Sequence, residues 1–335
     1  MNSRNRHDRK SRKKDPIKHQ RKVLKTVLAL LIVILVLCIA AVGVGYYLVG
    51  NLNTVDFTGD DAELGISENA GASGVTNIAL FGVDTRDLSS NRGLSDAIII
   101  LTVDQKQNAV KMTSILRDSK VPIDGYGERK INSAYSYGGT ALAIKTLNQN
   151  FDLDIKEYVT VNFAQLADIV DSVGGVTVNL TPGEVSETNK NMAESFNNEP
   201  RVQSSGDVTL TGPQAVAYSR IRAIGNDNER ASRQQEVLNA VFDKIMTMPK
   251  SEYPAFIREF LALVETSLDY GDLLALSPIA VSGFTVENYT VPDAAYETDL
   301  WGGIDSTGAW VWTYDLHAAA ERVHGIIYGT SYPAE

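Results

Sequence analysis

The chain has 335 residues, with 31 Lys and Arg against 41 Asp and Glu and a formal net charge of −10. Its only cysteine, Cys38, lies in an apolar segment near the N-terminus, which excludes disulfides, thiol nucleophiles and cysteine-ligated metals from the rest of the chain. Only His317 and His324 follow that segment, which argues against a Ser-His-Asp site and against a histidine-rich zinc site.

The N-terminal segment predicts a membrane anchor. Residues 1–25 hold eleven Lys and Arg but only two acidic residues, and Val27–Val49 contains no charged residue. At about 1.5 Å per residue this run spans a hydrocarbon core of about 30 Å, and it exceeds the roughly 7–15 apolar residues of a signal-peptide core. The positive-inside rule then predicts a cytoplasmic tail at 1–25, a transmembrane helix at 26–49 and an extracellular remainder.

The rest of the chain divides into a linker and one domain. Residues 50–74 are polar and are expected to form an extracellular linker, with a single domain from 75 to 335. The basic tail at 1–25 could also bind nucleic acid, but beside a spanning segment it is more simply interpreted as an orientation signal.

Three predicted strands open the domain: Thr76–Val83, Ala97–Val103 and Ala109–Leu116. If they form an antiparallel meander, the end of the first, the start of the second and the end of the third share one edge of a sheet. Those positions carry Asp84, Asp96 and Arg117, and Arg86 lies in the first loop. We therefore expect two carboxylates and two guanidiniums to meet on loops held by a rigid scaffold.

The following segments alternate between strand and helix patterns. In chain order we expect a glycine-rich loop at 121–139, a helix at Thr140–Asn150 and a strand at Tyr158–Val161. A helix from Phe163 to Val173 should follow, and Gly174 and Gly175 should end it. After it we expect a strand at Val176–Leu180 and an irregular stretch at 181–207. This alternation predicts a single α/β/α layered domain with a mixed central sheet. Residues 246–335 are expected to add a terminal strand and helix that close the fold.

Four arginines crowd into the stretch from Tyr218 to Gln235. Thr211 is expected to cap a short helix, after which the chain turns extended near Tyr218. In an extended segment Arg220 and Arg222 face the same side, whereas a continued helix splays them apart.

A second helix is expected near Glu229, with Asp227 as its N-cap, and it places Arg230, Arg233 and Gln234 on one face. An arginine in the first turn opposes the helix dipole, which a bound anion would compensate. The alternative is that these arginines pair with local acids such as Asp227, Glu229 and Glu236. The whole set, together with Arg86 and Arg117, favours an anion site, and guanidinium forks suit phosphate.

Seven segments occur in a recognisable order: NIALFGVDTRD (77–87), SDAIIILTVD (95–104), SILRD (114–118), KINSAYSYGG (130–139), YVTVNF (158–163), VDSVGGVTVNL (170–180) and LTGPQAVAYSRIR…DNERASRQQEVL (210–238). By these segments the chain resembles the LytR-CpsA-Psr family over about residues 75–245, and residues 246–335 match only loosely. Two positions depart from the family pattern. Leu94 stands where an arginine is usual, so one phosphate contact is absent unless Arg92 supplies it, and Leu116 replaces a proline.

The resemblance implies a membrane-anchored phosphotransferase. Such a protein moves an anionic glycopolymer, such as teichoic acid or capsule, from a polyprenyl-pyrophosphate carrier to a peptidoglycan hydroxyl and forms a phosphodiester. The resemblance also implies that Asp84 and Asp96 hold Mg²⁺, with Mn²⁺ as the alternative. Residues implied in catalysis are Asp84, Arg86, Asp96, Arg117, Arg220, Arg222, Asp227 and Arg230. Residues expected to contact substrate in addition are Lys130, Asn132, Arg233 and Gln234.

Two other functions fit parts of the sequence. A polyprenyl-pyrophosphate hydrolase would use the same residues with water as the acceptor. A non-catalytic module would bind or regulate lipid-linked polymers, but Asp84, Asp96 and Arg117 argue against a dead site. A nucleic-acid function is not expected, because the arginine cluster follows the predicted span on its outer side.

Overall fold

The protein is described here by a computed structural model that covers residues 60–67, 70–83, 93–224 and 227–249, short stretches between 252 and 276, and residues 285–297 and 299–329. The predicted tail and transmembrane helix lie outside these residues. Within the part of the chain that the structure describes, none of the helices combines the length and hydrophobicity needed to cross a bilayer. The described part of the expected linker lies against the domain, because Leu64 is buried in its core.

The centre of the domain is a mixed six-stranded sheet with the strand order β10-β3-β2-β1-β6-β9. Its strands are β1 (Val75–Val83), β2 (Ser95–Asp104), β3 (Ala109–Ile115), β6 (Glu157–Asn162), β9 (Glu265–Thr266) and β10 (Thr285–Val291). The first three strands form the predicted antiparallel meander. β6 runs parallel to β1 and β10 parallel to β3, which makes the sheet mixed as the sequence predicts.

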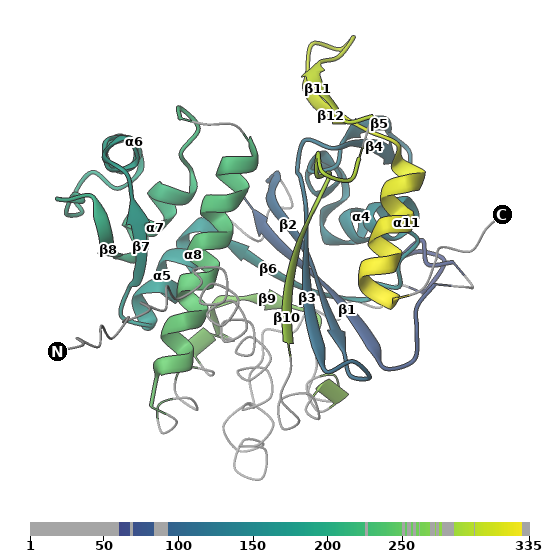
Figure 1. Ribbon diagram of the computed structural model, residues 1–335, viewed down its shortest axis with the longest axis horizontal. Coiled ribbons are helices and arrows are strands. Elements are labelled where there is room, and N and C mark those ends of the chain that lie inside the picture. Colours follow the sequence, from purple (N-terminus) through teal and green to yellow (C-terminus); the bar gives the residue numbers. More distant parts are fainter. Residues whose placement is uncertain are drawn as a thin grey trace, which may run out of the picture.

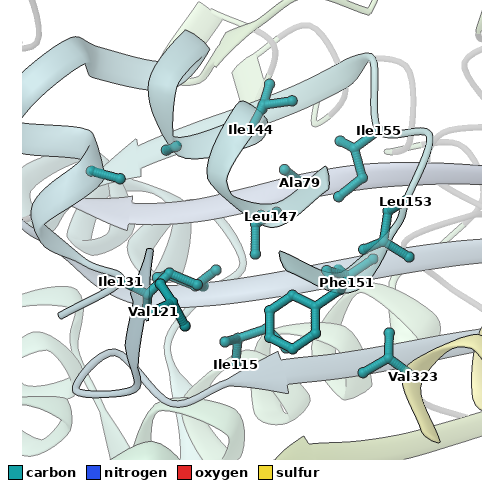
Figure 2. Packing of buried hydrophobic residues seen from close by; sticks show 14 of the residues in the cluster. Ala79, Ile115, Val121, Ile131, Ile144, Leu147, Phe151, Leu153, Ile155 and Val323 are labelled. Carbon is teal, nitrogen blue, oxygen red and sulfur yellow. The ribbon is translucent and has the colours of Figure 1, made fainter. Parts of the chain in front are cut away.

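Helices flank the sheet (Figure 1), and buried apolar side chains form two cores. The first core lies between the sheet and two helices, α4 (Ser133–Phe151) and α11 (Leu316–Tyr328), and Figure 2 shows Leu147 and Phe151 of α4 above the strands. The second core lies among α5 (Phe163–Ser172), α7 (Gly212–Ser219) and α8 (Asp227–Thr247), together with the paired strands β7 (Val176–Leu180) and β8 (Gly206–Leu210).

The segment 121–139 is not the long loop that its glycines indicate. It forms a hairpin of β4 (Lys120–Ile123) and β5 (Gly127–Lys130), followed by the first turns of α4. The hairpin forms because Val121 and Ile123 alternate into the first core, where both are buried. Gly138 and Gly139 have non-helical backbone angles that kink α4, and the predicted helix Thr140–Asn150 is the part after that kink.

The segment 181–207 is irregular only at residues 196–205, because residues 182–195 form α6 (Pro182–Ser195) and β8 begins at Gly206. Its start carries a capping box, in which Thr181 and Glu184 exchange hydrogen bonds between side chain and backbone, with Pro182 in the first turn. The helix is polar, so it lacks the apolar periodicity on which the prediction relied. The C-terminal part contains α11 as expected, and it adds β10 to the sheet and a separate hairpin, β11 (Trp301–Ile304) with β12 (Trp310–Thr313).

Candidate anion-binding site

Asp96 is the centre of a buried charge cluster at the start of β2. Arg117, which follows β3, donates from Nη1 to Asp96 Oδ1 at 2.7 Å. Arg230, in the first turn of α8, donates from Nη2 to Oδ2, and Arg222 Nη2 lies 3.6 Å from the same oxygen. The meander, α8 and the segment between α7 and α8 therefore bring one carboxylate and three guanidiniums together, and the predicted meeting of Asp96 with Arg117 is confirmed.

The charges of this cluster depend on one another. Burial alone would raise the pKa of Asp96, but Arg230 and Arg117 outweigh burial and hold that pKa below its usual value. Burial lowers the pKa of Arg230, while Asp96 opposes the change. Because a guanidinium starts from a very high pKa, Arg230 stays charged at neutral pH. The cluster then carries one negative and three positive charges, an excess that attracts an anion.

Arg230 has hydrogen-bond donors left over. The residue is 3% exposed, yet its Nε and Nη1 atoms have no hydrogen-bond partner within the described part of the chain. A buried charged donor without an acceptor is costly. A bound oxyanion would supply the missing acceptors in this environment. The unpaired donors of Arg230 therefore agree with the sequence-based prediction of an anion near the start of α8.

A pocket opens beside the cluster. It is lined by Asp96, Ala97, Ile98, Ile99, Ser114, Ile115, Leu116, Arg117, Asp118, Arg230 and Gln234. Its β2 and β3 walls are mainly apolar, whereas its charged groups belong to the Asp96 cluster and to Asp118. A ligand with an anionic head and an apolar tail matches this division. Gln234 thus lies where the sequence predicts it, one helical turn after Arg230.

Lys130 and Asn132 help to position Arg117, the first through Asp118 and the second through the backbone. Lys130 Nζ donates to Asp118 Oδ1 at 2.6 Å, and Asp118 Oδ2 lies 3.4 Å from Arg117 Nε. The backbone N–H of Asn132 donates to the carbonyl of Arg117 at 3.2 Å. Asp118 was not among the predicted site residues. It ends the SILRD segment, directly after Arg117, and it is buried. An acid in that position is a signal of an ion pair with the neighbouring arginine.

Arg220 and Arg233 do not join the cluster. Arg220 donates to Ser195 Oγ at 3.1 Å, and its guanidinium lies 4.9 Å from the centre of the Phe163 ring. The expected extended turn near Tyr218 is wrong: α7 continues to Ser219, and Arg220 itself has φ −95° and ψ 1°. Arg220 and Arg222 therefore point apart, as in the helical alternative.

Arg233 instead connects α8 to α6 and to the segment that precedes α8. Its Nε lies 3.0 Å from Glu184 Oε1 on α6, and its Nη2 donates to the carbonyl of Ile224 at 3.0 Å and lies 3.6 Å from Glu229. The alternative of pairing with local acids is correct for Arg233. For Arg230, the acidic partner among the described side chains is Asp96, 134 positions away, and not the local acids Glu229 or Glu236.

Several predicted site residues lie outside the described residues. Asp84, Arg86 and Arg92 follow β1, which ends at Val83 opposite Ser95, so their placement stays a prediction. The helix α8 begins at Asp227, two residues earlier than expected, but the side chain of Asp227 is not described. Among the described residues, no three His, Cys, Asp or Glu side chains group as metal ligands.

Comparison with known proteins defines the class. The model of the LytR_cpsA_psr family matches residues 49–323, so the chain belongs to this family. It is 30% identical over 293 residues to the polyisoprenyl-teichoic acid–peptidoglycan teichoic acid transferase TagT of Bacillus subtilis (strain 168), which covers 84% of this chain and 89% of the relative.

Solved structures show the same fold. TagT bound to LIIa-WTA aligns with a TM-score of 0.59 at 23% identity, covering 83% of this chain and 97% of that one. The LytR-CPS2A-psr family protein YwtF (TagT) with bound octaprenyl pyrophosphate lipid aligns with a TM-score of 0.56 at 24% identity, covering 78% and 94%. The α/β domain with its mixed sheet is therefore a TagT-like fold.

Proposed function

We propose that this chain transfers an anionic glycopolymer from a polyprenyl-pyrophosphate carrier to a hydroxyl group of peptidoglycan. The family membership and the name of the Bacillus subtilis relative support this activity. The observation that carries it is the buried Arg230 side chain, whose Nε and Nη1 atoms have no partner among the described residues, beside a pocket that has apolar walls and a charged rim. A pyrophosphate attached to a prenyl chain has the same division into anion and hydrocarbon.

In the proposed complex the pyrophosphate lies against Arg230, Arg117 and Arg222, and the prenyl chain follows the apolar walls of β2 and β3. Arg230 and Arg117 are held in place by Asp96, so their charges are oriented before the substrate arrives. The Arg222 side chain is 62% exposed and lies at the rim, where it can meet an incoming phosphate. Arg220 and Arg233 have structural contacts elsewhere and are not part of this clamp.

The reaction is a phosphoryl transfer. The acceptor hydroxyl oxygen attacks the phosphorus that carries the sugar, and the bond from this phosphorus to the oxygen bridging the two phosphates breaks. Polyprenyl phosphate leaves with the bonding electron pair, the hydroxyl proton is released, and a phosphodiester joins polymer and acceptor. Negative charge grows on the leaving phosphate, and guanidiniums fixed around it stabilise that charge.

Mg²⁺, or Mn²⁺ in its place, is part of the proposal. Asp96 stays ionised and offers hard oxygen ligands, and its Oδ1 atom, which accepts a hydrogen bond from Arg117, has a second lone pair. Asp96 therefore fits as one ligand, with Asp84 as the second that the family resemblance implies. Mg²⁺ commonly takes one or two carboxylates and completes its shell with substrate phosphates and water. When bound, it would supply charge neutralisation at the pyrophosphate.

The direct test is a transfer assay with the full-length protein in detergent. The substrates are a short-chain polyprenyl-pyrophosphate saccharide and a peptidoglycan oligomer, and the products are separated by mass. The proposal requires a phosphodiester-linked saccharide that appears only when the oligomer is present. Release of saccharide phosphate at the same rate without the oligomer would make the protein a hydrolase, and binding without turnover would make it a non-catalytic module.

A further inference from the structure

Asp118 is a buried carboxylate at the pocket that the proposed chemistry does not use. The residue is 4% exposed and lines the same pocket as Arg117 and Arg230. Its Oδ1 atom accepts a hydrogen bond from Lys130 Nζ at 2.6 Å, and its Oδ2 atom lies 3.4 Å from Arg117 Nε. A negative charge beside an anion site weakens the attraction for the anion. The presence of Asp118 therefore calls for a role that offsets this effect.

A tight turn allows Asp118 to pair with its own neighbour in sequence. In an extended strand, consecutive side chains point to opposite faces. Arg117 and Asp118 instead occupy the two central positions of a β-turn directly after β3, in which the backbone N–H of Ser119 donates to the carbonyl of Leu116 at 2.9 Å. The backbone therefore bends at the point where the two side chains meet.

The backbone of this turn is held by two strands that lie far away in sequence. The N–H of Leu116 donates to the carbonyl of Val291, the last residue of β10, at 2.8 Å. The N–H of Trp312 in β12 donates to the carbonyl of Asp118 at 2.9 Å. With the main chain fixed in this way, the remaining freedom of Arg117 lies in its long side chain.

Two carboxylates restrain the guanidinium of Arg117. Its Nη1 atom donates to Asp96 Oδ1 at 2.7 Å, and its Nε atom faces Asp118. A guanidinium is a rigid plane, so partners at two of its nitrogens set its position and its tilt, whereas one partner leaves it free to rotate about that contact. The Arg117 side chain is still 18% exposed and lines the pocket, so a ligand can reach it. The contact with Asp118 is the one that removes this rotation.

Lys130 offsets the charge that Asp118 brings. The Asp96 cluster alone has one acid and three arginines, an excess of two positive charges. Adding Asp118 reduces the excess to one, and adding Lys130 restores it to two. The pair therefore restrains Arg117 without weakening the field that attracts the anion.

We propose that Asp118 and Lys130 form a positioning pair, in which Asp118 fixes the direction of the Arg117 guanidinium toward the pyrophosphate and Lys130 offsets the charge of Asp118. The identity of the anion rests on the proposed function. The pair reverses the effect expected from charge alone, because removal of an acid makes the site more positive and yet should slow the reaction.

The test compares variants in the transfer assay with the full-length protein. Asp118→Asn keeps the size of the side chain but removes its charge. Charge alone predicts a lower KM for the polyprenyl-pyrophosphate saccharide and an unchanged kcat. A positioning role predicts a kcat lower by about tenfold without an increase in KM, because the contact matters most in the transition state. Asp118→Glu, which keeps the charge but displaces the carboxylate, should lower kcat as well.

Lys130→Gln examines the other half of the pair. It leaves the charge of Asp118 without its offset, so KM should rise about tenfold while kcat changes little. The double variant with Asp118→Asn restores the wild-type net charge, so its KM should return to within about twofold of the wild-type value. Asp124→Asn is the matched control: Asp124 accepts from Lys145 Nζ at 2.6 Å in the turn between β4 and β5, and its side chain is 54% exposed. Its kcat and KM should be those of the wild type.

Failure of the proposed function and failure of the pair give different results. If the wild-type protein performs no transfer, calorimetry with short-chain polyprenyl pyrophosphate still tests the pair. Lys130→Gln should then bind about tenfold more weakly, and the double variant should bind like the wild type. An unchanged kcat for both folded Asp118 variants would overturn the proposal. A double variant that binds as weakly as Lys130→Gln would also overturn it, because Lys130 would then contact the substrate directly. Absence of any binding by the wild-type protein would overturn the pair and the proposed function together.

Discussion

Arg230 is the residue on which the proposed anion site depends, and its environment explains why. A buried guanidinium normally uses most of its donors, whereas Arg230 uses one nitrogen on Asp96 and leaves two nitrogens without partners in the described structure. Unpaired buried donors of this kind indicate a site where a ligand supplies the hydrogen-bond acceptor. Arg233, three residues further along α8, is as deeply buried and has acidic and carbonyl partners, so it serves as its structural counterpart.

Replacement of Asp96 tests the buried cluster through its pH dependence. Asp96→Asn should lower the free energy of unfolding by about 3 kcal/mol at neutral pH, because it leaves buried arginines without their counter-charge. The pKa of Asp96 is lowered on folding, so its stabilisation is present above the ordinary value of 3.8 and is lost as the pH falls through the lower folded value. Urea unfolding across this range should show the gap between wild type and variant closing below pH 3.8.

The control for this measurement is Asp168→Asn, a change at an exposed position of α5 that should leave the stability unaltered. A gap between wild type and Asp96→Asn that stays constant down to strongly acidic pH would contradict the buried ion cluster.

Arg222 and Arg220, two positions apart, should respond in opposite ways. Arg222 lies at the rim beside Asp96, whereas Arg220 contacts Phe163 and Ser195. Arg222→Ala should reduce transfer by about one decade, the loss of one charge-assisted contact, with little change in melting temperature. Arg220→Ala should lower the melting temperature and leave transfer per folded molecule nearly unchanged. The reverse ranking in a transfer assay would place Arg220 in the clamp.

At the scale of elements, the site depends on how α5, α7 and α8 pack beside the sheet. Gly212 opens α7, and a Cβ atom there would lie 2.1 Å from the carbonyl oxygen of Ala167 in α5. Its backbone N–H also donates to Asp171 Oδ1 at 2.7 Å. The contact between these helices therefore requires glycine. It supports the second core, from which α8 directs Arg230 into the site.

Gly212→Ala should therefore lower the free energy of unfolding by about 1–3 kcal/mol, because the added methyl group forces α7 away from α5. Gly183→Ala is the matched control: Gly183 lies in α6, and the nearest atom to an added Cβ is 3.8 Å away. That change should stabilise the protein by up to about 1 kcal/mol through helix propensity. Equal effects of the two substitutions in chemical denaturation would show that the α5–α7 contact is not as close as described.

The elements also show where sequence patterns are informative. Strong runs of β-branched residues predicted the meander, and with it the meeting of Asp96 and Arg117. The hairpin at 120–130 and the polar helix α6 were missed, because the first is stabilised by burial of Val121 and Ile123 against distant residues, and the second by its capping box. The separation of Arg220 from Arg222 depends on where one helix ends, which is the least predictable property of a helix.

For the whole molecule, we predict a membrane-anchored enzyme with its site on the outer side. The charge-free run from Val27 to Val49 and the basic residues before it support this topology. Protease added to intact, wall-stripped cells should degrade the domain and spare an N-terminal fragment of the tail. An antibody to each end of the chain detects the two parts, and permeabilised cells provide the control. A domain that resists protease only in intact cells would overturn the localisation and the proposed substrate.

The chemistry of the site could be inferred from the sequence only in outline. The density of arginines within an acidic chain indicated an anion, but it did not separate Arg230, two of whose nitrogens have no partner among the described residues, from Arg233, each of whose nitrogens has one. That difference arises from Asp96 and Glu184, which lie 134 and 49 positions away from their partners. Contacts over such separations depend on the completed fold, so local patterns do not report them.

We propose that Arg230 binds the pyrophosphate of a prenyl carrier, and calorimetry of short-chain polyprenyl pyrophosphate binding to the full-length protein measures this contact. Arg230→Lys is compared with Arg233→Lys, a matched buried position on the same helix, after thermal melting has shown that both variants are folded. Binding of Arg230→Lys should be weaker by about one to two decades, because a point charge cannot replace the guanidinium fork, and binding of Arg233→Lys should be unchanged. Wild-type affinity in folded Arg230→Lys protein would contradict it.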